Sequence, residues 1–84
     1  MGRKHWDKRR EHLRGVLRAM REEAGFTQVE LAAKLPGKMQ SYVSKYERGE
    51  RKLDVVEVDE ICAACGLDFV SFAQRYVVQS ASPA

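Results

Sequence analysis

The sequence predicts an all-α domain, and three kinds of observation support this prediction. Apolar residues recur at helical spacing along most of the chain, and no segment shows the alternating pattern of a half-buried strand. Two capping boxes, TQVE at 27–30 and DVVE at 54–57, mark helix starts. Gly25, Gly49 and Gly66 follow apolar stripes, as helix-terminating glycines do. We therefore expect five helices with short connections in one compact domain.

The first predicted helix starts near Trp6 or Asp7 and ends at Gly25. Gly15 lies within it, and this glycine either lowers helix stability by about 1 kcal/mol relative to alanine or permits a neighbour to approach closely. The apolar stripe of this helix is formed by Leu13, Val16, Leu17, Met20 and Ala24.

Two short helices surround a turn in the middle of the chain. The first is capped by Thr27 and ends at the Pro-Gly pair 36–37, and the second spans 40–48 with Val43 and Tyr46 facing inward. Two short helices joined by a turn containing glycine have the arrangement of a helix-turn-helix. The narrow apolar face of the first consists of Leu31, Ala32 and Leu35.

The last third of the chain predicts two more helices. Asp54 caps the fourth, which ends at Gly66, and Asp68 is placed to cap the fifth. The inward positions of the fourth helix are Val58, Ile61, Cys62 and Cys65. The stripe of the fifth helix is Phe69, Phe72, Ala73 and Tyr76.

Length and composition indicate a single small globular domain. A chain of 84 residues buries only about 60% of its unfolded surface, and its 44% hydrophobic and 32% charged residues are typical of folded proteins. No apolar run approaches the roughly 18 residues that span a bilayer, and no apolar stretch follows the charged N-terminus as in a secretion signal. We therefore expect a cytoplasmic protein with no membrane partner and with reduced cysteines.

Charge is distributed unevenly along the chain. Residues 1–24 carry a net +4, residues 25–53 a net +3 and residues 54–84 a net −4. This polarity suits a protein with one face toward a polyanion, although solvated charged helix faces would give a similar count.

The pair Cys62 and Cys65 raises the possibility of a metal or redox site. A zinc site needs about four ligands, and only His5 and His12 could complete one, while a thioredoxin-like motif needs a βαβ context. Buried small hydrophobes are the favoured interpretation. No nucleophile–base pair, carboxylate dyad or phosphate-binding glycine loop is present, so we expect no enzyme activity, metal, cofactor or small-molecule substrate.

The central region resembles the Cro/C1-type (XRE-like) family of helix-turn-helix DNA-binding domains. The resemblance covers about residues 12–75 and implies a compact five-helix, lambda-repressor-like fold in which the second and third helices form the helix-turn-helix. Matching positions are Thr27, Gln28, Leu31, Ala32, Ser44, Glu47, Gly49, Leu53 and the run Cys65-Gly66-Leu67.

The third helix is predicted to enter the major groove and read bases. With Val43 and Tyr46 inward, its outward side chains include glutamine and lysine, which pair with adenine and guanine respectively. The predicted base-reading residues are Gln40, Ser41, Lys45 and, as a weaker candidate, Ser44. The predicted phosphate contacts are Gln28, Lys38, Tyr42, Arg48, Arg51 and Lys52. For Tyr42, packing over the turn is the alternative.

Two further expectations concern the geometry of the third helix. The resemblance implies a buried structural ion pair between Arg21 and Glu47, which would fix this helix on the scaffold. The turn 36–39 has four residues where family members commonly have three. We expect Met39 to replace the usual apolar anchor by turning inward, and Lys38 to point toward phosphate.

The predicted organisation has three parts. Residues 1–11 form either a basic N-terminal arm lying along DNA or an extension of the first helix, residues 12–78 form the helix-turn-helix domain, and residues 79–84 form a frayed tail. The predicted partner is double-stranded DNA with a palindromic operator, bound by a homodimer. Candidate dimer residues, which would otherwise complete the core, are Phe69, Phe72, Tyr76, Val77 and Val78.

The predicted function is transcriptional regulation, with repression as the expected mode. One alternative is an antitoxin-type protein that binds DNA through the same helices but has a toxin as its main partner. A second alternative is a protein-interaction module with a degenerate helix-turn-helix. The protein-interaction module is disfavoured because the chain keeps polar residues at positions predicted to contact DNA, namely Gln28, Gln40, Lys45 and Arg48.

Overall fold

The computed structural model describes the backbone of residues 5–81 and the side chains of residues 8–78. Within this range the chain forms five helices and no strand, which confirms the predicted all-α class. The helices are α1 (His5–Glu23), α2 (Gln28–Ala33), α3 (Gln40–Arg48), α4 (Val55–Ala64) and α5 (Phe69–Ala81).

The helix starts follow from local side-chain chemistry. Thr27 Oγ1 accepts from the Glu30 amide at 3.1 Å, and Glu30 Oε1 accepts from the Thr27 amide at 2.8 Å. Asp54 and Glu57 form the same reciprocal pair at 2.8 and 3.0 Å. The Asp68 carboxylate accepts from the amide of the residue three positions later at 2.7 Å. Each such cap stabilises its helix by about 1 kcal/mol.

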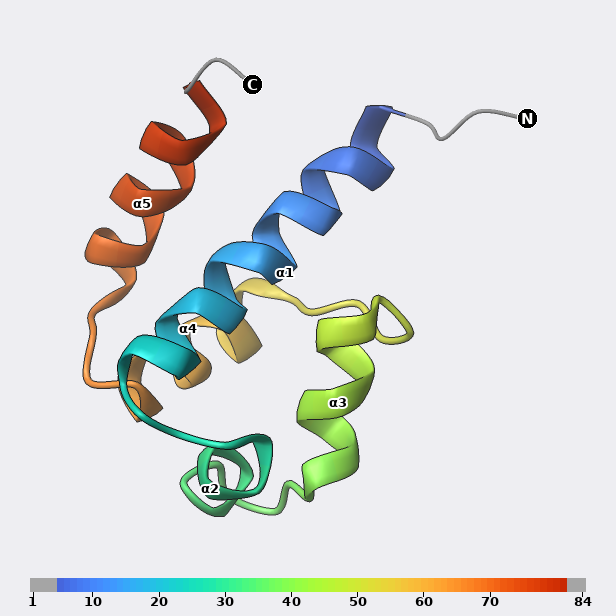
Figure 1. Cartoon of the computed structure of the whole chain (residues 1–84), viewed down its shortest axis with the longest axis vertical. Coiled ribbons are helices and arrows are strands. Elements are labelled where there is room, and N and C mark those ends of the chain that lie inside the picture. Colours follow the sequence, from blue (N-terminus) through green and yellow to red (C-terminus); the bar gives the residue numbers. More distant parts are fainter. Residues whose placement is uncertain (1–4, 82–84) are drawn as a thin grey trace.

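The five helices surround one core. In Figure 1, α1 crosses the middle of the molecule with α5 to its left, while α2 and α3 lie toward the bottom of the view. His12 and Tyr76 join α1 to α5, because the His12 Nε2 atom lies 2.9 Å from the Tyr76 carbonyl oxygen. The core residues are Val16, Leu17, Met20, Leu31, Ala32, Leu35, Val43, Tyr46, Val58, Ile61, Cys62 and Phe72.

The first and last helices extend into the segments that were expected to flank the domain. Residues 5–11 are part of α1, so this stretch extends the first helix, whereas residues 1–4 of the expected basic arm lie outside the described residues. The backbone of residues 79–81 continues α5, although the frayed tail was expected to begin at 79, and residues 82–84 are not described. Hydrogen bonding along the helix therefore persists past the last residue of the apolar stripe.

Gly15 serves no close packing. It is exposed, and a Cβ added at this position would meet no atom within 4 Å. Of the two interpretations given above, only the lower intrinsic helix stability remains.

Both cysteines are free thiols. Cys62 is buried and Cys65 is half-buried, and burial raises the pKa of the Cys62 thiol to about 11. Since the thiolate is the reactive form, Cys62 is a core hydrophobe at neutral pH. No helix in the described part of the chain is both long and apolar enough to cross a bilayer.

Candidate nucleic-acid interface

A buried ion pair attaches α3 to α1. Arg21 Nε donates to Glu47 Oε2 at 2.8 Å, and Arg21 Nη2 donates to Glu47 Oε1 at 3.1 Å. The two side chains are 10% and 5% exposed. Arg21 Nη1 also donates to the Phe26 carbonyl oxygen at 2.8 Å. The hydrogen bond that Arg21 donates to Glu47 raises the Arg21 pKa, and this bidentate contact fixes α3 against α1.

Two glutamines extend this pair toward the protein surface. Gln28 Nε2 donates to Glu47 Oε1 at 2.9 Å, and Gln40 Nε2 donates to Gln28 Oε1 at 3.0 Å. A continuous chain of hydrogen bonds thus runs from the buried carboxylate to the first residue of α3. Gln28, predicted to contact phosphate, is half-buried and forms the middle link of this chain.

The outer face of α3 is polar and open. Gln40, Ser41 and Lys45 are exposed, whereas Val43 and Tyr46 are fully buried beneath them. This division agrees with the inward and outward positions predicted from the sequence. Ser44 is half-buried and its hydroxyl oxygen accepts from Arg48 Nη1, so it is the least available of the four predicted base-reading residues.

Tyr42 lies between two cations. Lys38 Nζ is 4.7 Å from the centre of the Tyr42 ring, and the Arg51 guanidinium carbon is 5.0 Å from it. The Tyr42 hydroxyl donates to Glu57 at 3.4 Å, and burial raises the Tyr42 pKa to about 12. Both cation–π contacts hold basic side chains near the start of α4. Tyr42 thus contacts Lys38 of the turn, and its phosphate contact stays a prediction.

The expected inward position of Met39 is wrong. Met39 is the N-cap residue of α3, with an extended backbone (φ −116°), and its side chain is 75% exposed. The interior below the turn is already filled by Leu35 and Val43, which are 5% and 0% exposed. The extra residue in the turn 36–39 therefore adds exposed surface and no core contact. Lys38 is half-buried against Tyr42.

The remaining predicted phosphate contacts lie at the end of α3 and after it. Arg48 donates to the Glu50 carboxylate at 2.9 and 3.1 Å, and Arg51 pairs with Glu57. Both pairs are substantially solvent-exposed on the arginine side, so each contributes little to stability. Lys52 is exposed and has no ion-pair partner among the described residues.

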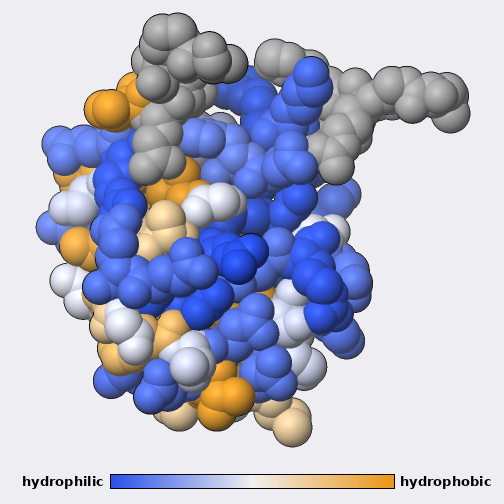
Figure 2. Space-filling model, viewed as in Figure 1, coloured by the Kyte–Doolittle hydropathy of each residue, from blue (hydrophilic) through white to orange (hydrophobic). Residues whose placement is uncertain are grey.

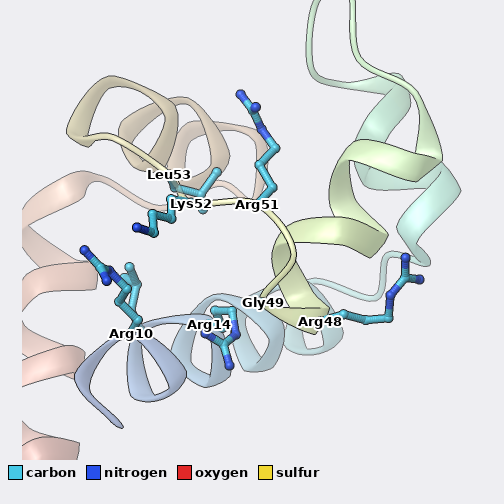
Figure 3. Close-up of a pocket in the computed structure, with 8 residues that line it drawn as sticks. Arg10, Arg14, Arg48, Gly49, Arg51, Lys52 and Leu53 are labelled. Carbon is cyan, nitrogen blue, oxygen red and sulfur yellow. The ribbon is translucent and has the colours of Figure 1, made fainter. Parts of the chain in front are cut away.

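Sequence reasoning missed Arg14 and placed Arg10 only within the basic segment 1–11, yet both arginines lie beside this loop. Arg10 and Arg14 of α1 line the same cavity of about 460 Å³ as Arg48, Arg51 and Lys52 (Figure 3). Their i, i+4 spacing placed them on one helix face, but only the tertiary fold brings that face against the loop after α3.

The surface chemistry differs between the two sides of the molecule. Figure 2 shows largely hydrophilic side chains over α1 and α3, and apolar side chains interspersed among hydrophilic ones on the α5 side. Of the candidate dimer residues, Val77 and Val78 are 62% and 68% exposed, and Phe69 and Tyr76 are half-buried. Phe72 is only 5% exposed, so it completes the core of its own chain, which is the other role considered for this group.

These features define a helix-turn-helix domain: α2 and α3 joined by a tight turn, with the second helix presenting an open polar face. The helix-turn-helix family model matches residues 17–72, two thirds of the sequence. The chain belongs to the Cro/C1-type (XRE) helix-turn-helix family, a family of DNA-binding transcriptional regulators and not of enzymes.

Solved structures agree with this assignment. An XRE-family-like protein from Pseudomonas syringae is 39% identical, with a TM-score of 0.79 over 88% of this chain and 89% of that one. The clp gene regulator ClgR from Corynebacterium glutamicum is 27% identical, with a TM-score of 0.72 over 83% and 88%. The restriction-modification controller protein C.Esp1396I, as a tetramer with its operator, is 25% identical, with a TM-score of 0.77 over 84% and 92%. No curated protein matches the sequence.

Proposed function

We propose that this regulator represses transcription by binding a specific double-stranded DNA sequence through the outer face of α3. The observation that carries the proposal is the hydrogen-bond chain from the buried Arg21–Glu47 pair through Gln28 to Gln40. A side chain that must read a base edge gains specificity when its position is set before binding. Here that positioning starts from an ion pair that is nearly buried between α1 and α3.

Base recognition is assigned to the open residues of α3. Gln40 offers an amide for adenine, Lys45 offers donors to guanine, and Ser41 pairs with either base. Ser44 reaches a base only if its contact with Arg48 opens. Each good contact contributes about 1–3 kcal/mol of discrimination.

Phosphate contacts supply most of the affinity in this proposal. Lys38, Arg51 and Lys52 are cationic and surround the ends of α3, with Arg48 at its last position. Gln28 and Tyr42 support the neighbouring side chains and contact phosphate only as a secondary role. Because phosphate contacts release counterions, binding should weaken steeply with salt.

We further propose that the protein acts as a homodimer on a palindromic operator. One domain reads about half a turn of DNA, and two-fold pairing doubles the site. The exposed Val77 and Val78, with the half-buried Phe69 and Tyr76, form the candidate interface on the side away from α3. The similar protein C.Esp1396I binds its natural operator as a tetramer. In this role the protein has no catalytic activity and acts in the cytoplasm, where prokaryotic and phage DNA is located.

Selection of bound sites from random double-stranded DNA, followed by fluorescence-anisotropy titration at several salt concentrations, tests the proposal. We expect a two-fold symmetric consensus and an affinity that falls linearly with salt on logarithmic axes. A uniform pool of recovered sequences, or an affinity independent of salt, would refute it.

A further inference from the structure

The cavity between α1 and the loop after α3 is lined by cations. Its walls include five basic side chains from two separate segments: Arg10 and Arg14 of α1, Arg48 at the end of α3, and Arg51 and Lys52 of the loop. Among the residues whose side chains are described, no acidic one lines it, and Leu13 and Leu53 contribute apolar surface. A concave site with this lining attracts anions strongly, because low-dielectric walls concentrate the field of the charges.

The five cationic side chains are not equally available to bind an anion in the cavity. Arg48 and Arg51 donate to Glu50 and Glu57, and in Figure 3 their guanidinium groups extend away from the cavity. Arg10 and Lys52 extend toward the same side of it from α1 and from the loop. No carboxylate of the described part of the chain pairs with Arg10, Arg14 or Lys52. These three side chains therefore form the uncompensated part of the site.

Arg14 lies close to the backbone at the end of α3. Its guanidinium lies against Gly49, so closely that a Cβ at that glycine would be 2.8 Å from the Arg14 guanidinium carbon. A cation at this position also interacts favourably with the C-terminal end of α3. That interaction explains why a cation is placed at position 14 alone. It does not account for Lys52, nor for Arg10, which lies one turn earlier on the same face and is repelled by Arg14.

We propose that this cavity is a phosphate-binding site in which Arg10, Arg14 and Lys52 hold the anion. Guanidinium groups present two parallel donors to phosphate oxygens, and the lysine ammonium adds a third charge. The phosphate comes either from the backbone of DNA that passes the C-terminal end of α3, or from a free phosphorylated small molecule. The first source rests on the proposed function, whereas the second does not.

Two titrations distinguish these sources, with the double variant Arg10→Gln/Arg14→Gln compared with Arg18→Gln. Arg18 is an exposed arginine of the same helix that pairs with Glu22 and lines no part of the cavity. In the first titration, calorimetry follows binding of inorganic pyrophosphate. In the second, fluorescence anisotropy follows binding of the selected DNA between low and high salt. Circular dichroism melting of each variant establishes that it is folded. The single variant Arg10→Gln repeats both titrations while leaving the contact between Arg14 and Gly49 intact.

If the phosphate is free, pyrophosphate binds the wild type and Arg18→Gln, and binding to the double variant is weaker by at least about tenfold. If the phosphate belongs to DNA, the double variant binds all DNA sequences less tightly, and its salt slope falls by about 1 for each DNA phosphate that it no longer neutralises.

The proposal is overturned if the double variant equals Arg18→Gln in both titrations. Sequence-specific DNA binding that persists in that case leaves the proposed function intact. A wild type that binds pyrophosphate through the cavity but no DNA would instead refute the proposed function alone.

Discussion

Arg21 of α1 and Glu47 of α3 form a two-point ion pair, with nitrogen–oxygen distances of 2.8 and 3.1 Å, in a position where both side chains are nearly buried. The same Glu47 oxygen that accepts from Arg21 Nη2 also accepts from Gln28. One carboxylate thus joins the first helix, the second helix and the recognition helix α3. The orientation of the DNA-reading face in our proposal therefore depends on a charge that never meets the DNA.

Replacing Glu47 by glutamine should destabilise the domain strongly. The substitution preserves shape but leaves the Arg21 charge buried without its partner, which costs about 3–5 kcal/mol in comparable pairs. Urea denaturation measures the decrease in stability. The control Glu50→Gln removes a carboxylate whose pair with Arg48 is more than half exposed, and it should change stability far less than Glu47→Gln does. Similar decreases in the two variants would contradict the structural role assigned to Glu47.

Alanine at two glycines should have opposite effects. Gly15→Ala should stabilise the domain by about 0.5–1 kcal/mol, because the position is helical, exposed and sterically open. Gly49→Ala should destabilise it, since Gly49 has a φ of 83° and a Cβ there would press on the Arg14 guanidinium. Thermal denaturation of the two variants side by side makes the comparison. A rise in stability for Gly49→Ala would show that the end of α3 is not constrained as described.

Removing the Tyr46 hydroxyl should not weaken the protein. Tyr46 is fully buried, and its hydroxyl has no hydrogen-bond partner among the described residues. Since an unpaired buried polar group costs about 1–3 kcal/mol, Tyr46→Phe should be at least as stable as the wild type. Tyr42→Phe, which removes the hydroxyl that donates to Glu57, is the matched control and should be slightly less stable. A decrease above about 1 kcal/mol for Tyr46→Phe in urea denaturation would disprove the unpaired state.

Glu57 should contribute to the acid sensitivity of the domain. The Asp54 amide, and after it Arg51, hold the Glu57 pKa below its ordinary value. A carboxyl with a lowered folded pKa stabilises the protein above its unfolded pKa of about 4.3, and this stabilisation is lost as pH falls through the folded pKa. Glu57→Gln should therefore be less stable than the wild type at pH 7 and nearly equal to it at about pH 3.

Denaturation midpoints measured across this pH range provide the test. The exposed Glu60 has no ion-pair partner in the described part of the chain, so Glu60→Gln should differ from the wild type by a small and nearly constant amount. A difference for Glu57→Gln that stays the same from about pH 7 to about pH 3 would contradict this role of the carboxylate.

The features that sequence predicted best are those set by a few neighbouring residues. The caps at Thr27, Asp54 and Asp68 need only a side chain and an amide three positions apart, and the structure has all three. The division of α3 into buried and exposed faces follows from helical periodicity in the same way.

Features that depend on tertiary neighbours were harder to predict from the sequence. Residues 21 and 47 are joined only by the fold, and it was the family resemblance that suggested their pairing. Met39 was expected inward because the space below the turn was unknown, and that space is already filled. The cation-lined cavity could not be predicted, because Arg10 and Arg14 meet residues 48–53 only in three dimensions.

The central claim is that the exposed residues of α3 read bases, and site selection with Lys45→Ala tests it most directly. The variant and the wild type would each select sites from the same random DNA pool, with Arg18→Gln as control. We predict that Lys45→Ala loses the preferred base at one position of each half-site and about 1–3 kcal/mol of affinity for the original site, while Arg18→Gln keeps the wild-type consensus. An unchanged consensus, with all sequences weakened equally, would show that Lys45 contacts only the DNA backbone and would contradict the claim.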